Sequence, residues 1–182
     1  MPDLIGTKIA YLGFCGPIDA NSVTKIAGVV NAAVNQQYDE ITLCFSSNGG
    51  YIGDGVYLYH HLRSLHIPLT IYNTGTVASI ATTLFVGAET RYCSPNSIFM
   101  MHPVAMPSGQ SATALQCALE AALHDEERTE RILRERTSIP EQVLLDRRSR
   151  EVFITPHQAL QYGLVNEIRD FTLPPGNQIV QI

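Results

Sequence analysis

The sequence predicts an α/β protein with a mostly parallel sheet. Three short runs are continuously apolar and rich in β-branched and aromatic residues, as in strands covered on both faces: Lys8–Phe14, Glu40–Phe45 and Pro68–Tyr72. Between them, Asp19–Asn35 and Asp54–Leu65 carry apolar residues at helical spacing, and Gly53 precedes the second of these helices. This order of strands and helices predicts parallel strands joined by right-handed crossovers.

The rest of the chain continues the pattern of short strands and helices. Ser79 precedes a helix of small residues. A long helix predicted over Ala112–Arg136 is charged in its second half, as in a solvated or interfacial face. Near the end, Thr155 is predicted to cap a short helix that starts at Pro156 and stops at Gly163. The predicted elements are a helix over Ile80–Val86, strands around Arg91–Cys93 and Ser97–Met101, helices over Ala112–Arg136, Pro140–Arg147 and Thr155–Tyr162, and a strand over Val165–Ile168.

Length and composition predict one folded domain. A chain of 182 residues can bury a substantial core but is short for two ordinary domains. We therefore expect a single domain over residues 1–182, with its core at about 8–168 and an extended tail over 171–182. The hydrophobic fraction of 45% excludes disorder over most of the length.

The net charge and the fraction of charged residues indicate which kinds of partner the chain can bind. A net charge of −5 with 12 Lys and Arg argues against a nucleic-acid partner, which would require a basic surface. The charged fraction of 16% lies below the usual ~25%, so we expect copies of the chain to cover part of its surface.

The sequence also predicts no membrane span and a cytoplasmic location. The longest nearly apolar stretch, Val77–Ala88, is shorter than the ~20 residues of a membrane span, and no secretory signal begins the chain. The four cysteines form no C-x-x-C pair and lie among apolar residues: Cys15, Cys44, Cys93 and Cys117. We predict buried free thiols in a reducing compartment, and neither a metal nor a cofactor.

A pair of glycines follows the predicted strand Glu40–Phe45. In Ser46-Ser47-Asn48-Gly49-Gly50, the glycines allow a sharp turn that brings backbone N–H groups close to a ligand. The ends of parallel strands are where such sheets place their sites. An ordinary turn between strand and helix explains this motif equally well.

Ser79 and His102 are the candidates for nucleophilic chemistry. Ser79 lies where a strand gives way to a helix, so it either caps the helix or acts as a nucleophile whose oxyanion the helix N-terminus stabilises. His102 ends a predicted apolar strand at Pro103 and is either a buried structural histidine or a general base. The two residues together favour the catalytic interpretation. Bland surface or partly buried positions are predicted for the other five histidines: His60, His61, His66, His124 and His157.

Four motifs in order resemble those of the ClpP family, the proteolytic subunits of the Clp proteases within the ClpP/crotonase superfamily. They are Ser47-Asn48-Gly49-Gly50 for S-P-G-G, Gly75–Ile80 for G-x-A-A-S-M, Ser94–His102 for L-P-N-S-x-x-M-x-H, and Thr155–Val165 for S-A-x-E-A-x-x-Y-G-L-V. The resemblance covers about Lys8 to Ile168. It implies a β-β-α spiral core with a protruding helical handle.

The resemblance also implies roles for individual residues. Ser79 matches the nucleophile, His102 the general base, and Gly50 and Ile80 the donors of the oxyanion hole. The third member of the triad is an aspartate in the family, and Glu151 stands at its position. The extra methylene of a glutamate displaces the carboxylate by about one bond length, and a misplacement of ~1 Å can cost ~100-fold in rate. Asp146 is the second candidate, and a surface pair of Glu151 with Arg150 is the structural alternative.

The implied partners are a peptide or unfolded-protein substrate, other copies of the chain in a homo-oligomeric ring, and a Clp-type ATPase. Several departures from the family's sequence pattern argue against a Clp-type ATPase as partner and against a stacked double ring. Only seven residues precede Lys8, and Asn48 replaces the proline of S-P-G-G. The stretch Pro103–Gln110 contains two prolines, and Ser149 replaces an acidic residue.

Three functions follow. The leading hypothesis is a ClpP-type serine endopeptidase, and the alternative is a weakly active or inactive ring subunit with a structural or regulatory role. A crotonase-type acyl-CoA hydratase is disfavoured, because the chain is short for that branch and the pair of Ser79 and His102 would have no task.

Overall fold

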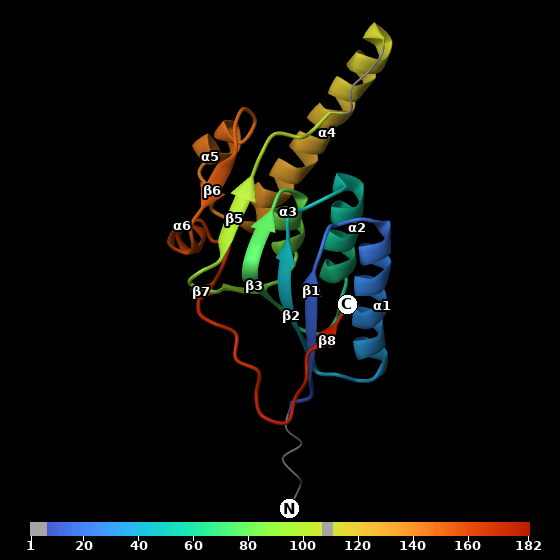
Figure 1. Ribbon diagram of the computed structural model, residues 1–182, viewed down its shortest axis with the longest axis vertical. Coiled ribbons are helices and arrows are strands. Elements are labelled where there is room, and N and C mark those ends of the chain that lie inside the picture. The colour runs from blue at the N-terminus through green and yellow to red at the C-terminus, as the bar shows by residue number, and fades with distance from the viewer. Residues whose placement is uncertain (1–6, 107–110) are drawn as a thin grey trace, which may run out of the picture.

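The computed structural model describes residues 7–106 and 111–182 and contains a sheet covered by helices (Figure 1). Parallel strands β1 (Ile9–Cys15), β2 (Glu40–Ser47) and β3 (Leu69–Ala78) form its centre. Helices α1 (Ala20–Asn35) and α2 (Ile52–Arg63) connect these strands. The predicted α/β class with a mostly parallel sheet is confirmed.

The sheet divides at β3, which has different neighbours along its two halves. The first half of β3 pairs in parallel with β4 (Thr90–Cys93), which in turn pairs with β7 (Glu167–Ile168). Its second half pairs in parallel with β5 (Ile98–Met101). Strand β6 (Val152–Ile154) pairs with β5 in the antiparallel direction. Among the described residues, the other strand pairs of the sheet are parallel. The division brings β5 and β6 alongside the carboxyl end of β3.

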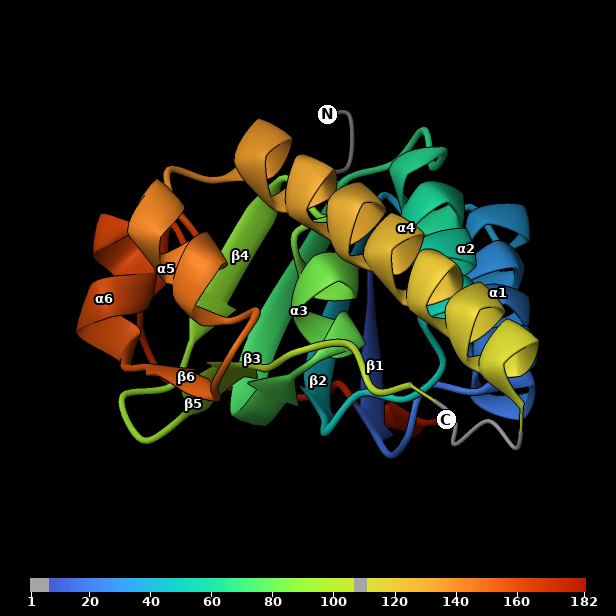
Figure 2. The same ribbon diagram turned by 90° about the horizontal axis from the view of Figure 1, so that it is seen from above.

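The remaining helices lie along one side of this sheet (Figure 2). Helix α3 (Ile80–Phe85) is buried beside β3, whereas α4 (Ala112–Arg136) extends beyond the rest of the molecule at its first half (Figure 1). Helices α5 (Glu141–Asp146) and α6 (Pro156–Gln161) flank β6. The projecting α4 agrees with the protruding helical handle expected from the sequence.

The C-terminal tail returns to the start of the sheet. Its strand β8 (Val180–Gln181) pairs in parallel with β1, and the N–H of Ile182 donates to the carbonyl of Gly13 at 2.9 Å. The ring of Phe171 packs against Tyr72 at a centroid distance of 5.3 Å. The tail was expected to be extended, but its pairing with β1 depends on a contact between the two ends of the chain that no local pattern predicts.

The hydrophobic core lies between the central strands and helices α1, α2 and α3. Its largest fully buried side chains come from all of these layers: Phe45, Phe85, Phe99, Ile18, Ile26, Ile41, Leu43, Leu58, Ile71 and Leu84, with Met101 and Leu133. Burying this much apolar surface is the main driving force for the fold. Within residues 7–106 and 111–182, no helix has the length and apolarity needed to cross a membrane.

Several sequence predictions need correction. Helix α2 begins at Ile52, so Gly53 lies inside it, and β3 continues past Tyr72 to Ala78. The last predicted strand shortens to its final two residues. The cysteines are free, but only Cys93 is buried and Cys44 is partly buried. Cys15, which ends an apolar strand, and Cys117, on the projecting part of α4, are exposed. Pro107 to Gln110 lie outside the described residues.

Candidate active site

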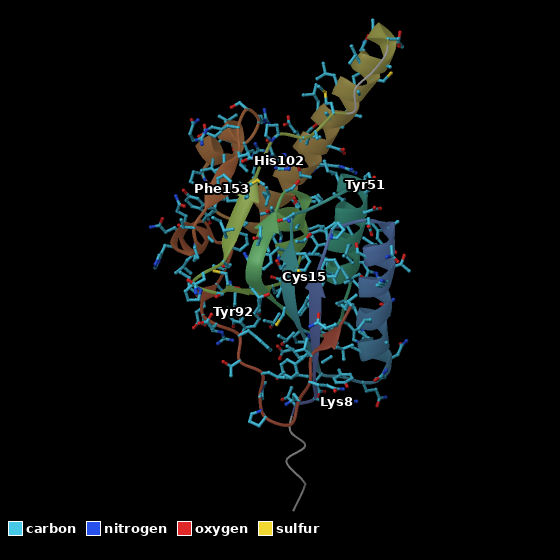
Figure 3. All side chains as sticks on the ribbon, viewed as in Figure 1. Lys8, Cys15, Tyr51, Tyr92, His102 and Phe153 are labelled. Carbon is cyan, nitrogen blue, oxygen red and sulfur yellow. The ribbon has the colours of Figure 1, made fainter. Side chains whose placement is uncertain are left out.

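Ser79 and His102 lie at the carboxyl ends of two adjacent parallel strands. Ala78, the last residue of β3, pairs with Met100 in β5, and the N–H of Ser79 donates to the carbonyl of Met100 at 2.8 Å. His102 follows the end of β5. Figure 3 shows His102 and Tyr51 at the end of the sheet where the arrows of β3 and β5 terminate, whereas Lys8 lies at the opposite end. The ladder therefore brings the serine and the histidine to the same edge of the sheet.

Ser79 has a backbone conformation that is rare for a residue other than glycine. Its φ is 58° and its ψ is −132°, and the first turn of α3 follows it at once, because the N–H of Thr82 donates to the carbonyl of Ser79 at 3.0 Å. A positive φ at a residue with a Cβ costs free energy and is concentrated at functional sites. The buried strand and buried helix on either side hold Ser79 in this conformation.

The turn with two glycines lies against Ser79. Gly49 has a φ of +94°, and a Cβ on it would be 3.2 Å from the Oγ of Ser79. Gly50 is equally confined, because a Cβ there would be 2.0 Å from the carbonyl oxygen of Ile18. The backbone of Ile18 fixes this turn by accepting from Tyr51 N–H and donating to the carbonyl of Gly49, both at 2.9 Å. Only glycines fit this arrangement.

Ser79, His102 and Gly50 line one cavity of about 570 Å³. Among the described residues, the backbone N–H of Gly50 has no hydrogen-bond acceptor in the protein. Ile80, at the N-terminal end of α3, also faces the cavity. Four of the five residues predicted for the site are brought together here. The cavity is lined by Gly50, Tyr51, Ile52, Ser79, Ile80, Thr83, Met101, His102, Pro103, Val104, Ala105, Asp125, Thr129 and Arg147.

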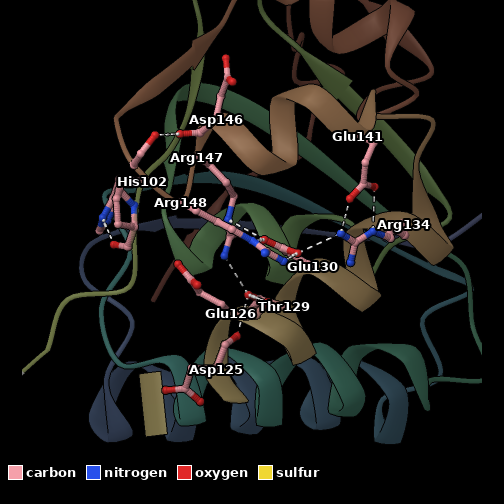
Figure 4. Close-up of polar contacts among 12 residues, drawn as sticks. His102, Asp125, Glu126, Thr129, Glu130, Arg134, Glu141, Asp146, Arg147 and Arg148 are labelled. Carbon is pink, nitrogen blue, oxygen red and sulfur yellow. Dashed lines mark hydrogen bonds and ion pairs between the residues drawn. The ribbon is translucent and has the colours of Figure 1, made fainter. Parts of the chain in front are cut away.

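The imidazole of His102 is hydrogen-bonded to the backbone. Its Nδ1 lies 2.6 Å from the carbonyl oxygen of Pro103, which can only accept a hydrogen bond (Figure 4). Nδ1 therefore carries a proton, and in the neutral ring this leaves the lone pair on Nε2, which is the tautomer that can accept a proton from a hydroxyl. The hydrogen bonds of the described residues include none between Ser79 Oγ and His102.

Glu151 lies just outside the strand pair that ends near His102, and it is not among the residues that line the cavity. Met101 and Val152 form the last pair of the antiparallel β5–β6 ladder; His102 follows Met101 and Glu151 precedes Val152. The side chain of Glu151 is exposed, and no hydrogen bond joins it to His102 among the described residues. The structural alternative, a surface pair of Glu151 with Arg150, is not among the ion pairs of the described residues, where Arg150 pairs with Asp146.

Asp146 is engaged elsewhere. The Nε2 of Gln142 donates to its carboxylate at 2.7 Å, and Arg150 forms an ion pair with it. These two contacts, with that of Gln142 the larger, lower the pKa of Asp146 below its usual value. The carboxylate points away from His102 (Figure 4). Among the described residues, neither Asp146 nor Glu151 is hydrogen-bonded to His102, and neither lines the cavity.

Three polar residues of the cavity lining were not predicted from the sequence. Asp125, Thr129 and Arg147 line the cavity, although the charged half of the long helix was predicted to be solvated or interfacial. Thr129 and Arg147 are in fact buried. The available signal was the stripe of Thr129, Ile132 and Leu133 at helical spacing, which marks the face of α4 that packs on the body.

Comparisons with known proteins agree with this architecture. The family model described as Clp protease matches residues 7–171. The ATP-dependent Clp protease proteolytic subunit 2 of Pseudomonas aeruginosa is 27% identical over 177 residues, which cover 92% of this chain and 86% of the relative. The ATP-dependent Clp protease proteolytic subunit of Paracoccus denitrificans is 25% identical over 155 residues, which cover 84% of this chain and 78% of the relative.

A solved structure has the same fold. The structure of a mutant of ClpP1 from Listeria monocytogenes superposes with a TM-score of 0.77 and covers 91% of this chain and 92% of that one. The two sequences are 23% identical in this comparison, so the likeness concerns the fold alone.

Proposed function

Because this chain belongs to the Clp protease family, we propose that it is a serine endopeptidase that hydrolyses peptide bonds with Ser79 as nucleophile and His102 as general base. The observation that carries this proposal is the convergence of both residues on one cavity, at the ends of strands joined by the 2.8 Å hydrogen bond from Ser79 to Met100. The tautomer of His102 supports the role of the base, since its Nε2 is free to accept a proton.

The reaction would proceed through an acyl-enzyme. Ser79 Oγ attacks the peptide carbonyl while His102 Nε2 takes the hydroxyl proton, and the N–H groups of Gly50 and Ile80 hold the oxyanion. The tetrahedral intermediate collapses as His102 gives the proton to the leaving amine. A water molecule, deprotonated by His102, then releases the peptide acid and restores Ser79. Glu151, which directly precedes the β6 residue paired with Met101, would orient the imidazole and stabilise its charged form.

The proposal extends to the assembly. We propose that residues 1–182 act as a single domain within a homo-oligomeric ring in the cytoplasm, with a peptide or an unfolded protein as substrate. Exposed leucines on the projecting half of α4 support association between copies: Leu115, Leu119 and Leu123. Such apolar side chains in a row are typical of an interface. A Clp-type ATPase as partner stays a prediction.

A second candidate function has support from the hydrogen bond of His102. Nδ1 of His102 is bonded to the carbonyl of Pro103 and not to a carboxylate, so the described residues do not show the acid–histidine contact of a complete triad. A glutamate also stands where the family has an aspartate. These observations favour a weakly active ring subunit with a structural or regulatory role.

A fluorophosphonate probe separates the two functions. The probe reacts covalently with a serine only when that serine is activated, so we expect labelling of the intact oligomer at Ser79, lost in Ser79→Ala and strongly slowed in His102→Ala. Labelling with subsequent cleavage of small peptides supports the endopeptidase. An assembled, folded oligomer that is not labelled would contradict it and would support the structural subunit.

A further inference from the structure

A buried guanidinium group forms part of the cavity that contains Ser79. Arg147 lies at the end of α5 with only 6% of its surface exposed, and it lines the cavity together with Thr129 of α4. Its Nη2 donates to Thr129 Oγ1 at 3.2 Å (Figure 4). Its Nε is buried and has no hydrogen-bond partner among the described residues. A guanidinium has five N–H donors, so most of this group's capacity is unused by the contacts described.

The carboxylate closest to Arg147 in the described ion pairs, that of Glu130, already accepts hydrogen bonds from other arginines. Glu130 is fully buried, and both of its oxygens accept from Arg148, at 2.8 and 2.6 Å, while Arg134 donates to one of them at 2.9 Å. The Nε of Arg147 remains 3.8 Å from Glu130, beyond hydrogen-bonding distance. Arg147 therefore forms a long ion pair with Glu130 but no hydrogen bond to it.

Among the described residues, the other carboxylates near the cavity form no hydrogen bond with Arg147 either. Asp125 lines the cavity, but it forms its own ion pair with Arg128 at 2.7 Å. Glu126 attracts Arg147 electrostatically, yet the two form no ion pair among the described contacts. Burying a charged group with unpaired donors is costly unless a ligand supplies the missing acceptors.

We propose that Arg147 is a specificity-determining residue, which binds the carboxylate of an acidic substrate side chain next to the scissile bond. This inference rests on the proposed function, because the cavity that Arg147 lines is the one that contains Ser79 and His102. A substrate whose carbonyl sits at Ser79 places its adjacent side chain in the same cavity. A carboxylate is the group that matches the planar, forked donors of a guanidinium.

Arg148 provides a matched control. It binds the same Glu130 but is about half exposed and does not line the cavity. Loss of Arg148 therefore disturbs the ion-pair cluster without removing the donor that faces the substrate. Loss of Arg147 does both.

The test uses peptide substrates that differ only in the residue before the cleaved bond, which is Glu, Gln or Leu. We expect kcat/KM for Glu to exceed that for Leu by at least about tenfold, as for one hydrogen bond to a charged group. Arg147→Gln should bring this ratio to about one, while Arg148→Gln leaves it unchanged. If Arg147→Gln does not fold, Arg147→Lys keeps the buried charge and should retain a reduced preference for Glu.

The outcomes are separable from those of the proposed function. Labelling of Ser79 by the fluorophosphonate probe is measured first, because its absence in folded protein contradicts the peptidase itself. If Ser79 is labelled but peptide turnover is too slow to measure, the preference for Glu over Leu is measured by competition. Peptides that end in Glu or in Leu are compared for how strongly each slows the labelling of Ser79. The specificity proposal would be overturned if peptides with Leu or Gln were cleaved as well as or better than those with Glu, or if Arg147→Gln left the preference for Glu unchanged. The proposed peptidase function would not be affected by either result.

Discussion

Gly49 lies so close to Ser79 that a Cβ atom on the glycine would be 2.6 Å from the Cβ of the serine. Real Cβ atoms do not approach so closely, and the φ of +94° at Gly49 is itself unfavourable for a residue with a side chain. The turn and the serine therefore fit each other only while position 49 has no side chain.

Gly49→Ala should displace Ser79 and slow fluorophosphonate labelling by at least about 100-fold, the cost of a misplacement of ~1 Å in a catalytic group. Gly53→Ala is the control, because a Cβ at Gly53 meets nothing within 4 Å. That change, inside α2, should leave the labelling rate unchanged and stabilise the protein by about 0.5–1 kcal/mol. Equal labelling rates in the two variants would show that the turn does not position the serine.

Replacing Glu151 tests the third member of the proposed triad. Glu151→Gln removes the charge proposed to orient His102, so labelling of Ser79 should slow by about 10²- to 10⁴-fold, up to the value known for the loss of a triad carboxylate. Asp146→Asn breaks only the contacts with Gln142 and Arg150 and should change the rate less than about twofold. A normal rate in Glu151→Gln would show that the carbonyl of Pro103 suffices to hold the imidazole.

The buried Glu130 should make stability sensitive to acid. Burial raises the pKa of Glu130, but the hydrogen bonds and charges of Arg148, Arg147 and Arg134 outweigh it, so the pKa lies below its usual 4.5. A lowered pKa stabilises the fold above the unfolded-state value, and this stabilisation is lost as the pH falls through the folded-state value. Urea unfolding should therefore show a free energy of unfolding that decreases below pH 4.5.

Removing the charge of Glu130 checks this assignment. Glu130→Gln leaves the arginines around it uncompensated and should lower the free energy of unfolding at pH 7 by about 3–5 kcal/mol. Glu141→Gln, which breaks an exposed pair with Arg134, should cost less than about 1 kcal/mol. If the two variants were equally stable, the cluster around Glu130 would not support the fold in this way.

The four cysteines should react unequally with iodoacetamide. Burial raises the pKa of Cys44 to about 11, so at pH 8 only about one in a thousand of its thiols is a thiolate. Cys93 is buried, and burial raises its pKa as well. We expect mass spectrometry to find alkylation at the exposed Cys15 and Cys117 in native protein, and at all four thiols once the protein is denatured. Rapid alkylation of native Cys44 would contradict its burial.

Local patterns predicted the elements whose ends are marked in the sequence. The long helix Ala112–Arg136 has the predicted bounds, because its periodicity is unbroken and no glycine or proline interrupts it. Helix α1 begins close to the start of the predicted range Asp19–Asn35, because Asp19 caps it by accepting from the N–H of Ser22 at 2.8 Å. In contrast, β3 was predicted to end before Asn73. That polar side chain is buried because it bonds to the carbonyl of Ile98, a tertiary contact.

The same distinction explains the site. Ser79, His102 and Gly50 each follow a predicted strand, so the rule that parallel strands end at one edge was enough to group them. Arg147 and Thr129 meet through the packing of α5 on α4, which depends on how two separate helices are placed. A charged residue at a helix end is typical of solvent exposure, and only the three-dimensional arrangement shows that this one is buried.

The pairing of β8 with β1 bears on where a reporter group can be attached to this protein. Because the last residue, Ile182, is bonded to Gly13, a tag fused directly behind it would pull on an edge of the sheet. A Cβ added at Gly13 would be 2.6 Å from the side-chain amide of Gln181, which would have to move aside. The exposed turn at Pro175 and Gly176, where an added Cβ meets no neighbour within 4 Å, offers an insertion point that leaves both strands paired.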